Sequence, residues 1–475
     1  MNSHNFSKKQ RTLILIPLLI GGFIALLNET LLNVAFPQLT LSLHVTINTV
    51  QWLATAYMLV IGISVPVIAF LLENIATKSL YLFAMLLFSI GTVCCGFSQT
   101  FSMLLVSRMV QGVGTGMLIP IMMNTILAIY PPEKRGAAIG LSMIVVVFAP
   151  VIGPTLSGLV LQYLNWHWLF FSTLPLAFIA IILGMFNLKN VSHLSRPKID
   201  GLSIILSIIG FGGIIFGICS IETMGFRNAT VMITLFCGIT GLTLFTLRQL
   251  SLKQPMLEMR AFRFPMFSLS TCLLLIAFMI PFSINIILPT YLQNILGLTP
   301  TEAGLALLLG GVVCGLITPL SGMLYDKIGV KPLVITGFGV LIITMTFFSH
   351  ISASMSLTFL IVLHCLTFLG TSLVNTPIQT NALNQLPKEY NTHGVAITNT
   401  IQQIAAAFGS SLFIGLMGAI QSNYLSKFKN PTILQQHTAV ISGVNSAFTA
   451  ALIMVVIAFM LSFFIKKTVM DTETS

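Results

Sequence analysis

The sequence predicts an all-α polytopic membrane protein, and two features of its composition carry that prediction. Hydrophobic residues make up 56% of the 475-residue chain and charged residues only 7%, whereas soluble domains contain roughly a quarter charged residues. The apolar residues also form runs of about 20, the length that a helix needs to cross a bilayer. A membrane β-barrel would instead require alternating segments of about 10 residues, and the sequence does not show that pattern.

Fourteen apolar runs can be placed along the chain. The first follows basic residues, as in a signal peptide, but it is too long for one and lacks a small-residue cleavage site. We therefore interpret it as a transmembrane helix of the mature protein. The expected spans lie near 12–36, 49–72, 79–97, 103–128, 136–162, 168–188, 201–221, 229–247, 266–293, 303–323, 331–350, 355–381, 393–421 and 442–465.

The basic residues indicate how these helices are oriented. With the N-terminus inside, eighteen of the 22 lysines and arginines fall in cytoplasmic segments, in agreement with the positive-inside rule. We therefore expect a multi-pass protein of the cell (plasma or inner) membrane with both termini in the cytoplasm. This bias accounts for the net charge of +11, so the charge does not indicate a nucleic-acid partner.

Two cytoplasmic turns repeat one pattern at a constant spacing. A proline, a small residue, an acid, a second small residue and a lysine occur in both, and each feature of the second copy lies 253 positions after its counterpart, as Gly322 does after Ala69. This indicates two homologous halves in parallel orientation. The spacing fits eight helices, so we predict two six-helix bundles, 1–190 and 251–475, separated by a two-helix insert at 191–250.

The repeated turn also indicates a latch. Small residues such as Gly322 and Gly329 let helices approach closely, and the carboxylates of Glu73 and Asp326 can cap a helix N-terminus or bind basic residues. Such a contact can hold the cytoplasmic side shut in one conformation. A simple tight loop is the alternative.

Few ionisable side chains are expected within the membrane. Glu29 is the only acid well inside a span and Arg108 the only base, and such residues usually line a cavity or an ion path. Both lie in the first half, so we expect them to pair, with Glu29 carrying a proton; a permanent structural ion pair is the alternative. His364 is a second candidate proton site, although a lone histidine is more often a packing residue.

Motifs along nearly the whole chain resemble the major facilitator superfamily, in particular its 14-helix drug:proton antiporter branch. The two turns resemble its G-x-L-x-D-x-x-G-[RK]-[RK] motif. The fourth span carries an R-x-x-Q-G-x-G pattern that includes Gln111 and Gly112, and the fifth resembles G-P-x-x-G-P-x-x-G-G at Pro150, Gly153 and Pro154. Two shorter segments resemble further branch motifs, at 166–170 and 298–305.

The resemblance implies a major facilitator fold and proton-coupled export of lipophilic, drug-like molecules by alternating access. The first helix departs from the family pattern L-D-x-T-x-x-N-x-A-x-P, because Asn28 occupies the aspartate position and the acid is Glu29. A shift of one residue rotates the acid by about 100° around the helix. The variant is similar to lincomycin-resistance-type exporters. Bends at Pro150 and Pro154 and the small-residue face beside them would let the fifth span pack differently in two states; static packing is the alternative.

Polar and aromatic side chains within the spans are the candidates for lining a substrate cavity, because polar groups in a bilayer prefer a protein interior or a water-filled space. A broad apolar cavity with few fixed polar contacts would suit a promiscuous binder. The candidates are Asn28, Asn33, Trp52, Tyr57, Gln111, Asn124, Asn285, Tyr291, Asn375, Gln379 and Asn399.

Two functions remain open at this point: a proton-driven multidrug exporter, or a dedicated proton-driven exporter of one endogenous metabolite, lipid or siderophore. The sequence contains no phosphate loop, metal-ligand spacing or catalytic-triad pattern, and all seven cysteines lie in apolar runs. We therefore expect no enzyme activity, no metal and no cofactor. The expected partners are small lipophilic substrates, protons and the bilayer, and we expect a monomer.

Overall fold

The computed structural model describes residues 6–191, 200–225 and 228–466. Within these ranges the side chain of Asn33, a predicted cavity residue, lies outside what is described. The regular structure of the described ranges is entirely helical. Thirteen of these helices are long and apolar enough to cross a membrane, and α3, which bends by 50° between Ser64 and Val67, makes a fourteenth. The predicted all-α membrane fold is therefore confirmed.

The helices follow the predicted order. Short 3-10 turns (η) extend several of them, and α7 and α8 together form one span. Their bounds are α1 Lys8–Leu31, η2 Leu32–Ala35, α2 Phe36–Ser42, α3 Ile47–Asn74, α4 Thr77–Gly96, α5 Phe101–Ile129, η3 Pro132–Lys134, α6 Arg135–Tyr163, α7 His167–Phe171, α8 Leu174–Asn187, α9 Gly201–Met224, α10 Ala229–Ser251, η4 Met259–Arg263, α11 Pro265–Asn294, α12 Pro300–Ile328, α13 Val330–Phe348, α14 Leu357–Asn384, η5 Lys388–Tyr390, α15 Asn391–Leu425 and α16 Ile433–Ser462.

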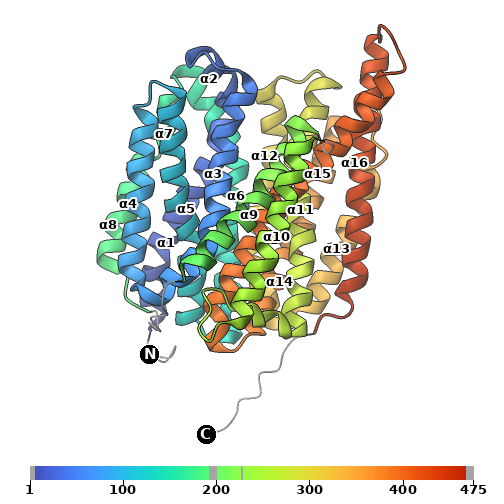
Figure 1. Cartoon of the computed structure of the whole chain (residues 1–475). Helices are drawn as coiled ribbons and strands as arrows, with labels where there is room; N and C mark the ends of the chain where they lie inside the picture. Colours follow the sequence, from blue (N-terminus) through green and yellow to red (C-terminus); the bar gives the residue numbers. More distant parts are fainter. Residues whose placement is uncertain (1–5, 192–199, 226–227, 467–475) are drawn as a thin grey trace.

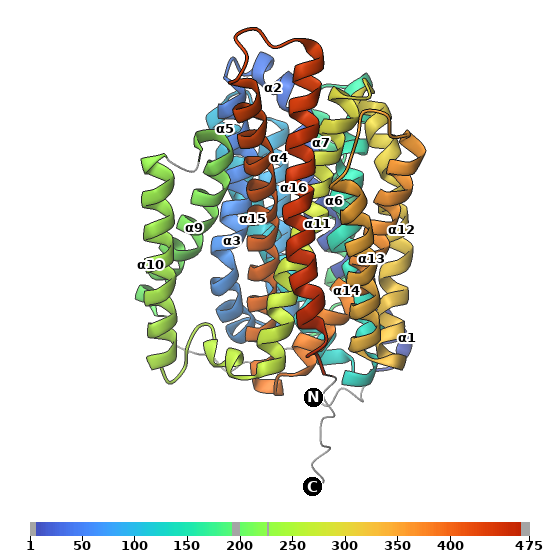
Figure 2. The same ribbon diagram turned by 90° about the vertical axis from the view of Figure 1, so that its right-hand side faces the viewer.

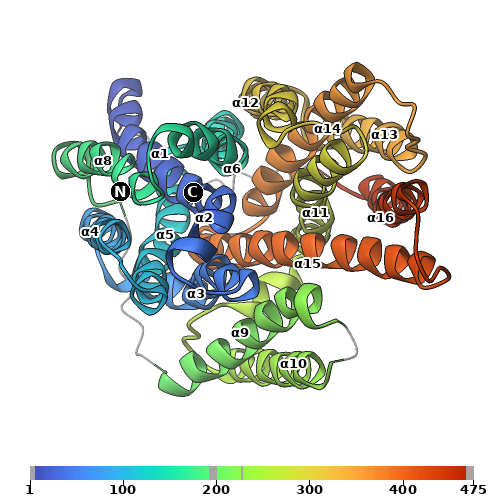
Figure 3. The ribbon, with the colours of Figure 1, turned by 90° about the horizontal axis from the view of Figure 1, so that it is seen from above.

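Seen from above, the helices form two bundles with a helical hairpin beside them (Figure 3). The first bundle contains α1, α3 to α6 and α8, the second contains α11 to α16, and the α9–α10 hairpin packs against α3 and α15. α1 begins and α16 ends on the same face of the molecule (Figure 1). On the opposite face α15 and α16 rise above the other helices (Figure 2). The domain limits 1–190, 191–250 and 251–475 stay a prediction, since 192–199 lies outside the described residues.

Glycines bring equivalent helices of the two bundles into backbone contact. A Cβ atom on Gly114 of α5 would lie 2.6 Å from the carbonyl oxygen of Ala84 in α4, and one on Gly370 of α14 would lie 3.0 Å from that of Gly337 in α13. Gly337 lies 253 positions after Ala84, and Gly370 lies 256 positions after Gly114. The same close crossing therefore occurs once in each half, as expected for two homologous bundles.

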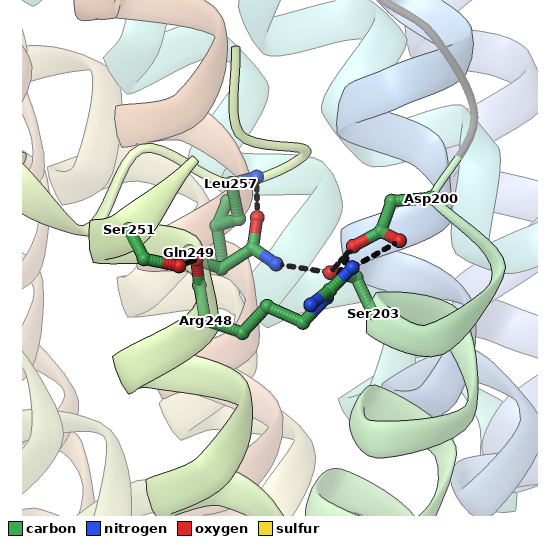
Figure 4. Close-up of polar contacts among 6 residues, drawn as sticks. All are labelled: Asp200, Ser203, Arg248, Gln249, Ser251 and Leu257. Carbon is green, nitrogen blue, oxygen red and sulfur yellow. Dashed lines mark hydrogen bonds and ion pairs between the residues drawn. The ribbon is translucent and has the colours of Figure 1, made fainter. Parts of the chain in front are cut away.

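A polar cluster joins the ends of α9 and α10 to the linker that leads into α11 (Figure 4). Arg248 donates hydrogen bonds of 2.7 and 2.9 Å to the carboxylate of Asp200. The buried side chain of Gln249 donates to Ser203 Oγ at 2.6 Å and accepts from the backbone N–H of Leu257 at 3.2 Å. The first contact joins α10 to α9 within the hairpin, and the second holds the hairpin to the linker that leads into the second bundle.

The Asp200–Arg248 contact leads to a pH prediction. Its hydrogen bonds lower the pKa of Asp200 to about 2, from an ordinary value of about 3.9. A lowered carboxyl pKa contributes stability that is present above about pH 4 and is lost as the pH falls towards about 2. The pairing of the start of α9 with the end of α10 is therefore expected to be constant between about pH 5 and about pH 8. Over that whole range, Asp200→Asn should raise amide hydrogen exchange in the first turn of α9.

The matched control for Asp200→Asn is Glu133→Gln, which changes another acid near the same face of the molecule. It should leave exchange at 201–204 unchanged. Exchange in wild type that rises steadily from pH 8 to pH 5, after correction for the intrinsic rate, would contradict the assigned role of Asp200.

Candidate functional site

Arg108 is fully buried in a polar cluster contributed by α1, α3, α4 and α5. It donates to the backbone oxygen of Asn28 at 3.1 Å and to Gln111 Oε1 at 2.7 Å. Its guanidinium carbon lies 3.9 Å from the centre of the Tyr57 ring. Gln111 in turn donates to Thr92 Oγ1 at 2.7 Å and to Asn28 Oδ1 at 3.4 Å. Neutral dipoles and an aromatic face thus hold this cation inside the bundle.

Glu29 is buried beside this cluster, with 5% of its surface exposed. In the described part of the chain, however, its carboxylate forms no ion pair with Arg108. The direct pair expected from the sequence is therefore absent from this conformation, and it is Asn28 that contacts the arginine. That contact is to the backbone oxygen of Asn28, whose side chain accepts from Gln111 of the same cluster. Glu29 follows by one residue, so its side chain points about 100° away from that of Asn28 around the helix.

Two neighbouring clefts lie between the bundles, and Val146 of α6 lines both. The larger has a cavity volume of about 30 Å³ and the smaller about 20 Å³. Of the predicted cavity residues, Asn399 lines the larger cleft and Asn285 the smaller, together with the predicted packing residue Pro150. The larger cleft is lined by Leu26, Ile61, Thr115, Gly116, Ile119, Pro120, Val146, Asn399, Gln402 and Gln403.

Thr115 and Gln403 were not among the predicted site residues. Gln403 lies one helical turn after Asn399, so the i, i+4 spacing of two amides was the signal that could have identified it. Thr115 connects the larger cleft to the arginine, because its hydroxyl shares a hydrogen bond of 2.6 Å with Tyr57 Oη. The ring of Tyr57 then covers Arg108. A continuous chain of contacts therefore runs from the cleft to the buried cation.

Trp52 and Asn124, both predicted to line the cavity, have other surroundings. The ring of Trp52 is 37% exposed and lies 5.4 Å from the ring of Phe216 in α9. Asn124 Oδ1 accepts a hydrogen bond of 3.1 Å from Thr392 Oγ1, so it joins α5 of the first bundle to α15 of the second. Neither residue lines the two clefts. Trp52 packs against the inserted hairpin, and Asn124 belongs to the contact between the bundles.

Three further predicted cavity residues lie inside the second bundle. Tyr291 donates to the backbone oxygen of Ser352 at 2.8 Å and so fixes the end of α11. Gln379 stands behind the larger cleft, where its Oε1 accepts from Gln402 Nε2 at 3.1 Å. Asn375 is 2% exposed, and its amide has no hydrogen-bond partner among the described residues.

Asp326 caps the N-terminus of α6 across the boundary between the bundles. Its two carboxylate oxygens accept from the backbone N–H groups of Gly136 and Ala137 at 2.9 and 3.0 Å. The helices touch there, since a Cβ atom on Gly322 would lie 2.1 Å from the carbonyl oxygen of Gly136. At the next turn Gly329 has a φ of 83°, a left-handed conformation that glycine adopts without a steric penalty.

A related contact closes the other seam between the bundles. The carboxylate of Glu73, at the end of α3, lies 3.0 Å from Nε2 of His393 in the first turn of α15. Glu73 belongs to the first copy of the repeated turn and Asp326 to the second. Both copies therefore place an acid at the start of a helix in the opposite bundle. In this conformation the two contacts hold the bundles together at the end of the molecule where α6 begins.

The proline motif of α6 packs directly on α1. Pro154 has no N–H, so the carbonyl of Pro150 has no partner within the helix. Thr30 Oγ1 donates to that carbonyl at 3.1 Å. A Cβ atom on Gly153 would meet the same hydroxyl at 2.1 Å. In α5, Gly112 allows a similar approach, because its Cβ would lie 3.2 Å from the backbone oxygen of Tyr57.

His364 lies in the second bundle at the place that corresponds to Arg108 in the first. It is 256 positions after Arg108, and Gly310 is 253 positions after Tyr57. Where Tyr57 covers the arginine, Gly310 leaves a notch in which a Cβ atom would lie 2.3 Å from His364 Nδ1. The imidazole is fully buried, and neither ring nitrogen has a partner among the described residues. From this environment we expect His364 to act as a packing residue rather than as a proton site.

We expect His364→Leu to retain transport. The substitution removes two buried nitrogens without partners, each of which costs about 1–3 kcal/mol, so the thermal midpoint in detergent should stay constant or rise. Gly310→Ala should instead lower stability by about 1–3 kcal/mol through overpacking of the notch. Loss of proton-driven transport in His364→Leu with an unchanged midpoint would show that this imidazole carries protons.

The fold and the site together define a helical membrane transporter. It is built from two homologous bundles, with clefts between the bundles and an acid and a base buried inside the first one. A family model described as Major Facilitator Superfamily matches residues 18–410. The chain belongs to this superfamily of transporters, as the motifs of its spans and turns indicated.

The curated relatives include lincomycin resistance proteins. The chain is 45% identical over 463 residues to "Lincomycin resistance protein LmrB" of Bacillus subtilis (strain 168), with 96% of each chain covered. It is 42% identical to the protein of the same name in Listeria monocytogenes, with 94% of this chain and 95% of that one covered. Among solved structures, the human organic anion transporter MFSD10 (TETRAN) aligns with a TM-score of 0.66 at 12% identity, covering 95% of this chain and 99% of the other. This last similarity concerns the fold alone.

Proposed function

We propose that the protein is a proton-coupled antiporter that exports lipophilic, drug-like molecules from the cytoplasm by alternating access. Glu29 is the proton carrier and Arg108 is coupled to it. One observation carries the proposal: a carboxylate buried inside the first bundle lies beside a buried guanidinium without pairing with it. A carboxylate without a cation partner is costly in a membrane interior, so binding a proton relieves that cost.

The contacts around Arg108 supply a route for coupling. Leu26 lines the larger cleft, and Glu29 follows it by about one turn of α1. From the opposite side, Thr115 leads through Tyr57 to Arg108. A molecule that enters the cleft therefore displaces the same helices that surround the acid, so that substrate binding and proton binding influence each other.

Alternating access requires a contact that breaks when the cytoplasmic side opens. The helix cap by Asp326 and the pair of Glu73 with His393 hold that side together in this conformation. Both cross the boundary between the bundles, and neither lies inside one bundle. Rocking of one bundle against the other would therefore separate these groups while leaving each bundle intact.

We place the protein in the cell membrane with both termini in the cytoplasm. The face on which α1 begins and α16 ends (Figure 1) is also the face of the basic turn residues, such as Lys78, Lys134 and Lys331, and positive charge favours the cytoplasmic side. A single chain contains both bundles and the clefts between them, which supports a monomer as the functional unit. No nucleic acid or cofactor is part of the proposed cycle.

A dedicated exporter is the second candidate. The two relatives above are named for resistance to a single antibiotic, which favours a narrow substrate range. The alternative substrate would be one endogenous metabolite, lipid or siderophore, also driven by protons.

Proton movement in proteoliposomes tests the proposal. Purified protein is reconstituted with a pH-sensitive dye inside, and lincomycin and a panel of unrelated lipophilic compounds are added in turn. Proton flux with several unrelated compounds supports the multidrug antiporter. Flux with one compound alone supports the dedicated exporter, and substrate movement without any proton flux refutes the proton coupling.

A further inference from the structure

We infer that α15 forms the recognition surface for uncharged hydroxyl and N–H groups of the substrate, while the helices of the first bundle receive its apolar part. The inference rests on the proposed function and adds the chemistry of the substrate to it. It predicts that donor-rich neutral groups, such as those of a sugar or an amide, are bound on one side of the larger cleft.

The two walls of the larger cleft differ in chemistry. From α15, Asn399, Gln402 and Gln403 contribute three primary amides at positions i, i+3 and i+4, which lie on one face of a helix. From α1 and α3, Leu26 and Ile61 contribute aliphatic side chains. Among the described residues that line this cleft none is charged.

Existing hydrogen bonds determine what the amides offer. Gln402 Nε2 donates to Gln379 Oε1 at 3.1 Å, and Asn399 Nδ2 donates to the backbone oxygen of Val395 at 2.8 Å. Each of these side chains thus keeps its carbonyl oxygen for another donor. The side chain of Gln403 forms no hydrogen bond with the described part of the chain, so its amide can both donate and accept. The wall therefore offers more acceptors than donors and suits substrates that carry O–H or N–H groups.

Such a wall also discriminates against substrates without these groups. An apolar molecule in the cleft would cover the three amides and remove their water without replacing their hydrogen bonds, which is unfavourable. A site built to bond hydroxyl or N–H groups rejects analogues that lack them more strongly than an apolar site rejects a larger or smaller molecule. Substrate range would then depend on α15, separately from the acid in α1.

Gln403→Leu is the test variant, because Gln403 has no partner within the described chain and its loss leaves no other group unbonded. The probes are lincomycin, which carries hydroxyl and amide groups, and tetraphenylphosphonium, a lipophilic cation without hydrogen-bond donors or acceptors. Uptake into everted membrane vesicles should show a KM for lincomycin raised about 10-fold with little change in kcat, whereas the KM for tetraphenylphosphonium should fall, because leucine removes an amide that this cation leaves without a hydrogen bond.

Gln421→Leu is the matched control, since it makes the same change on α15 outside both clefts, and it should alter neither KM. Gln403→Asn, which keeps a shorter amide, should raise the lincomycin KM by about 3-fold. Equal changes for both probes in Gln403→Leu, or no change in either, would overturn the inference. Wild-type protein that moves neither probe would instead overturn the proposed function.

Discussion

Glu29→Gln is expected to lower substrate-driven proton movement at least about 100-fold, because the variant replaces the proposed proton carrier with a neutral amide that binds no proton. Glutamine has nearly the same shape, so the packing of α1 against α6 should persist. Exchange of labelled for unlabelled lincomycin across the membrane, which needs no net proton transfer, should continue near the wild-type rate. Measuring both reactions in one preparation separates loss of the proton from loss of the fold.

The matched control is Glu302→Gln. Glu302 lies in the first turn of α12, where its side chain accepts from the backbone N–H of Thr299 in a capping box. Glutamine serves the same position in capping boxes, so this variant should transport normally. If proton flux survives in Glu29→Gln, Glu29 has a structural role and the proton is carried elsewhere.

Gly322→Val should have the second largest effect, by preventing closure of the contact between α6 and α12. A Cβ atom at this position would lie 2.1 Å from the carbonyl oxygen of Gly136. An overpacking penalty of about 3 kcal/mol that acts on the closed conformation alone would change the ratio of closed to open molecules by roughly 100-fold. We therefore expect transport to fall about 10- to 100-fold.

Distances between spin labels at the start of α6 and the end of α12 would measure this shift directly. Gly304→Val makes the same change on the same helix at a position where a Cβ atom meets nothing within 4 Å, and it should resemble wild type. Normal distances and normal transport in Gly322→Val would mean that the α6–α12 contact is not a gate.

The fold could be predicted because a bilayer imposes simple rules on a chain. Helix length follows from membrane thickness, orientation follows from the placement of lysine and arginine, and the 253-residue spacing between Ala69 and Gly322 connects the two halves. None of these signals depends on knowing which helices touch. The fourteen spans could therefore be predicted from the sequence. So could the burial of Glu29 and Arg108 within those spans.

The lining of the cavity could be predicted only in part, because a membrane helix is apolar on every side. The period of 3.6 residues that orients a helix in a soluble protein is then weak. The sequence places Trp52 inside a span, but it does not reveal that its ring faces Phe216 of the inserted hairpin. Asn124 poses the same problem, since its partner Thr392 lies in the other half of the chain.

The contacts that side chains form across the boundary between the bundles also could not be predicted from the sequence. Asp326 binds backbone N–H groups, which carry no sequence signature, and His393 is separated from Glu73 by most of the chain. The prolines of α6 indicated a carbonyl without a helical partner, but they could not indicate that Thr30 satisfies it. These contacts depend on how two helices meet in space rather than on either helix alone.

The two halves share one architecture but carry different chemistry at corresponding places. Arg108 lies under an aromatic ring in the first half, whereas His364 occupies a glycine notch in the second, and the amides of the cleft come from the second half. On the function proposed above, substitutions on α15 would therefore change which compounds are exported while Glu29 of α1 and Arg108 of α5 stay unaltered. A duplicated gene of this kind would let one half evolve towards new substrates while the other half keeps the groups proposed to bind the proton.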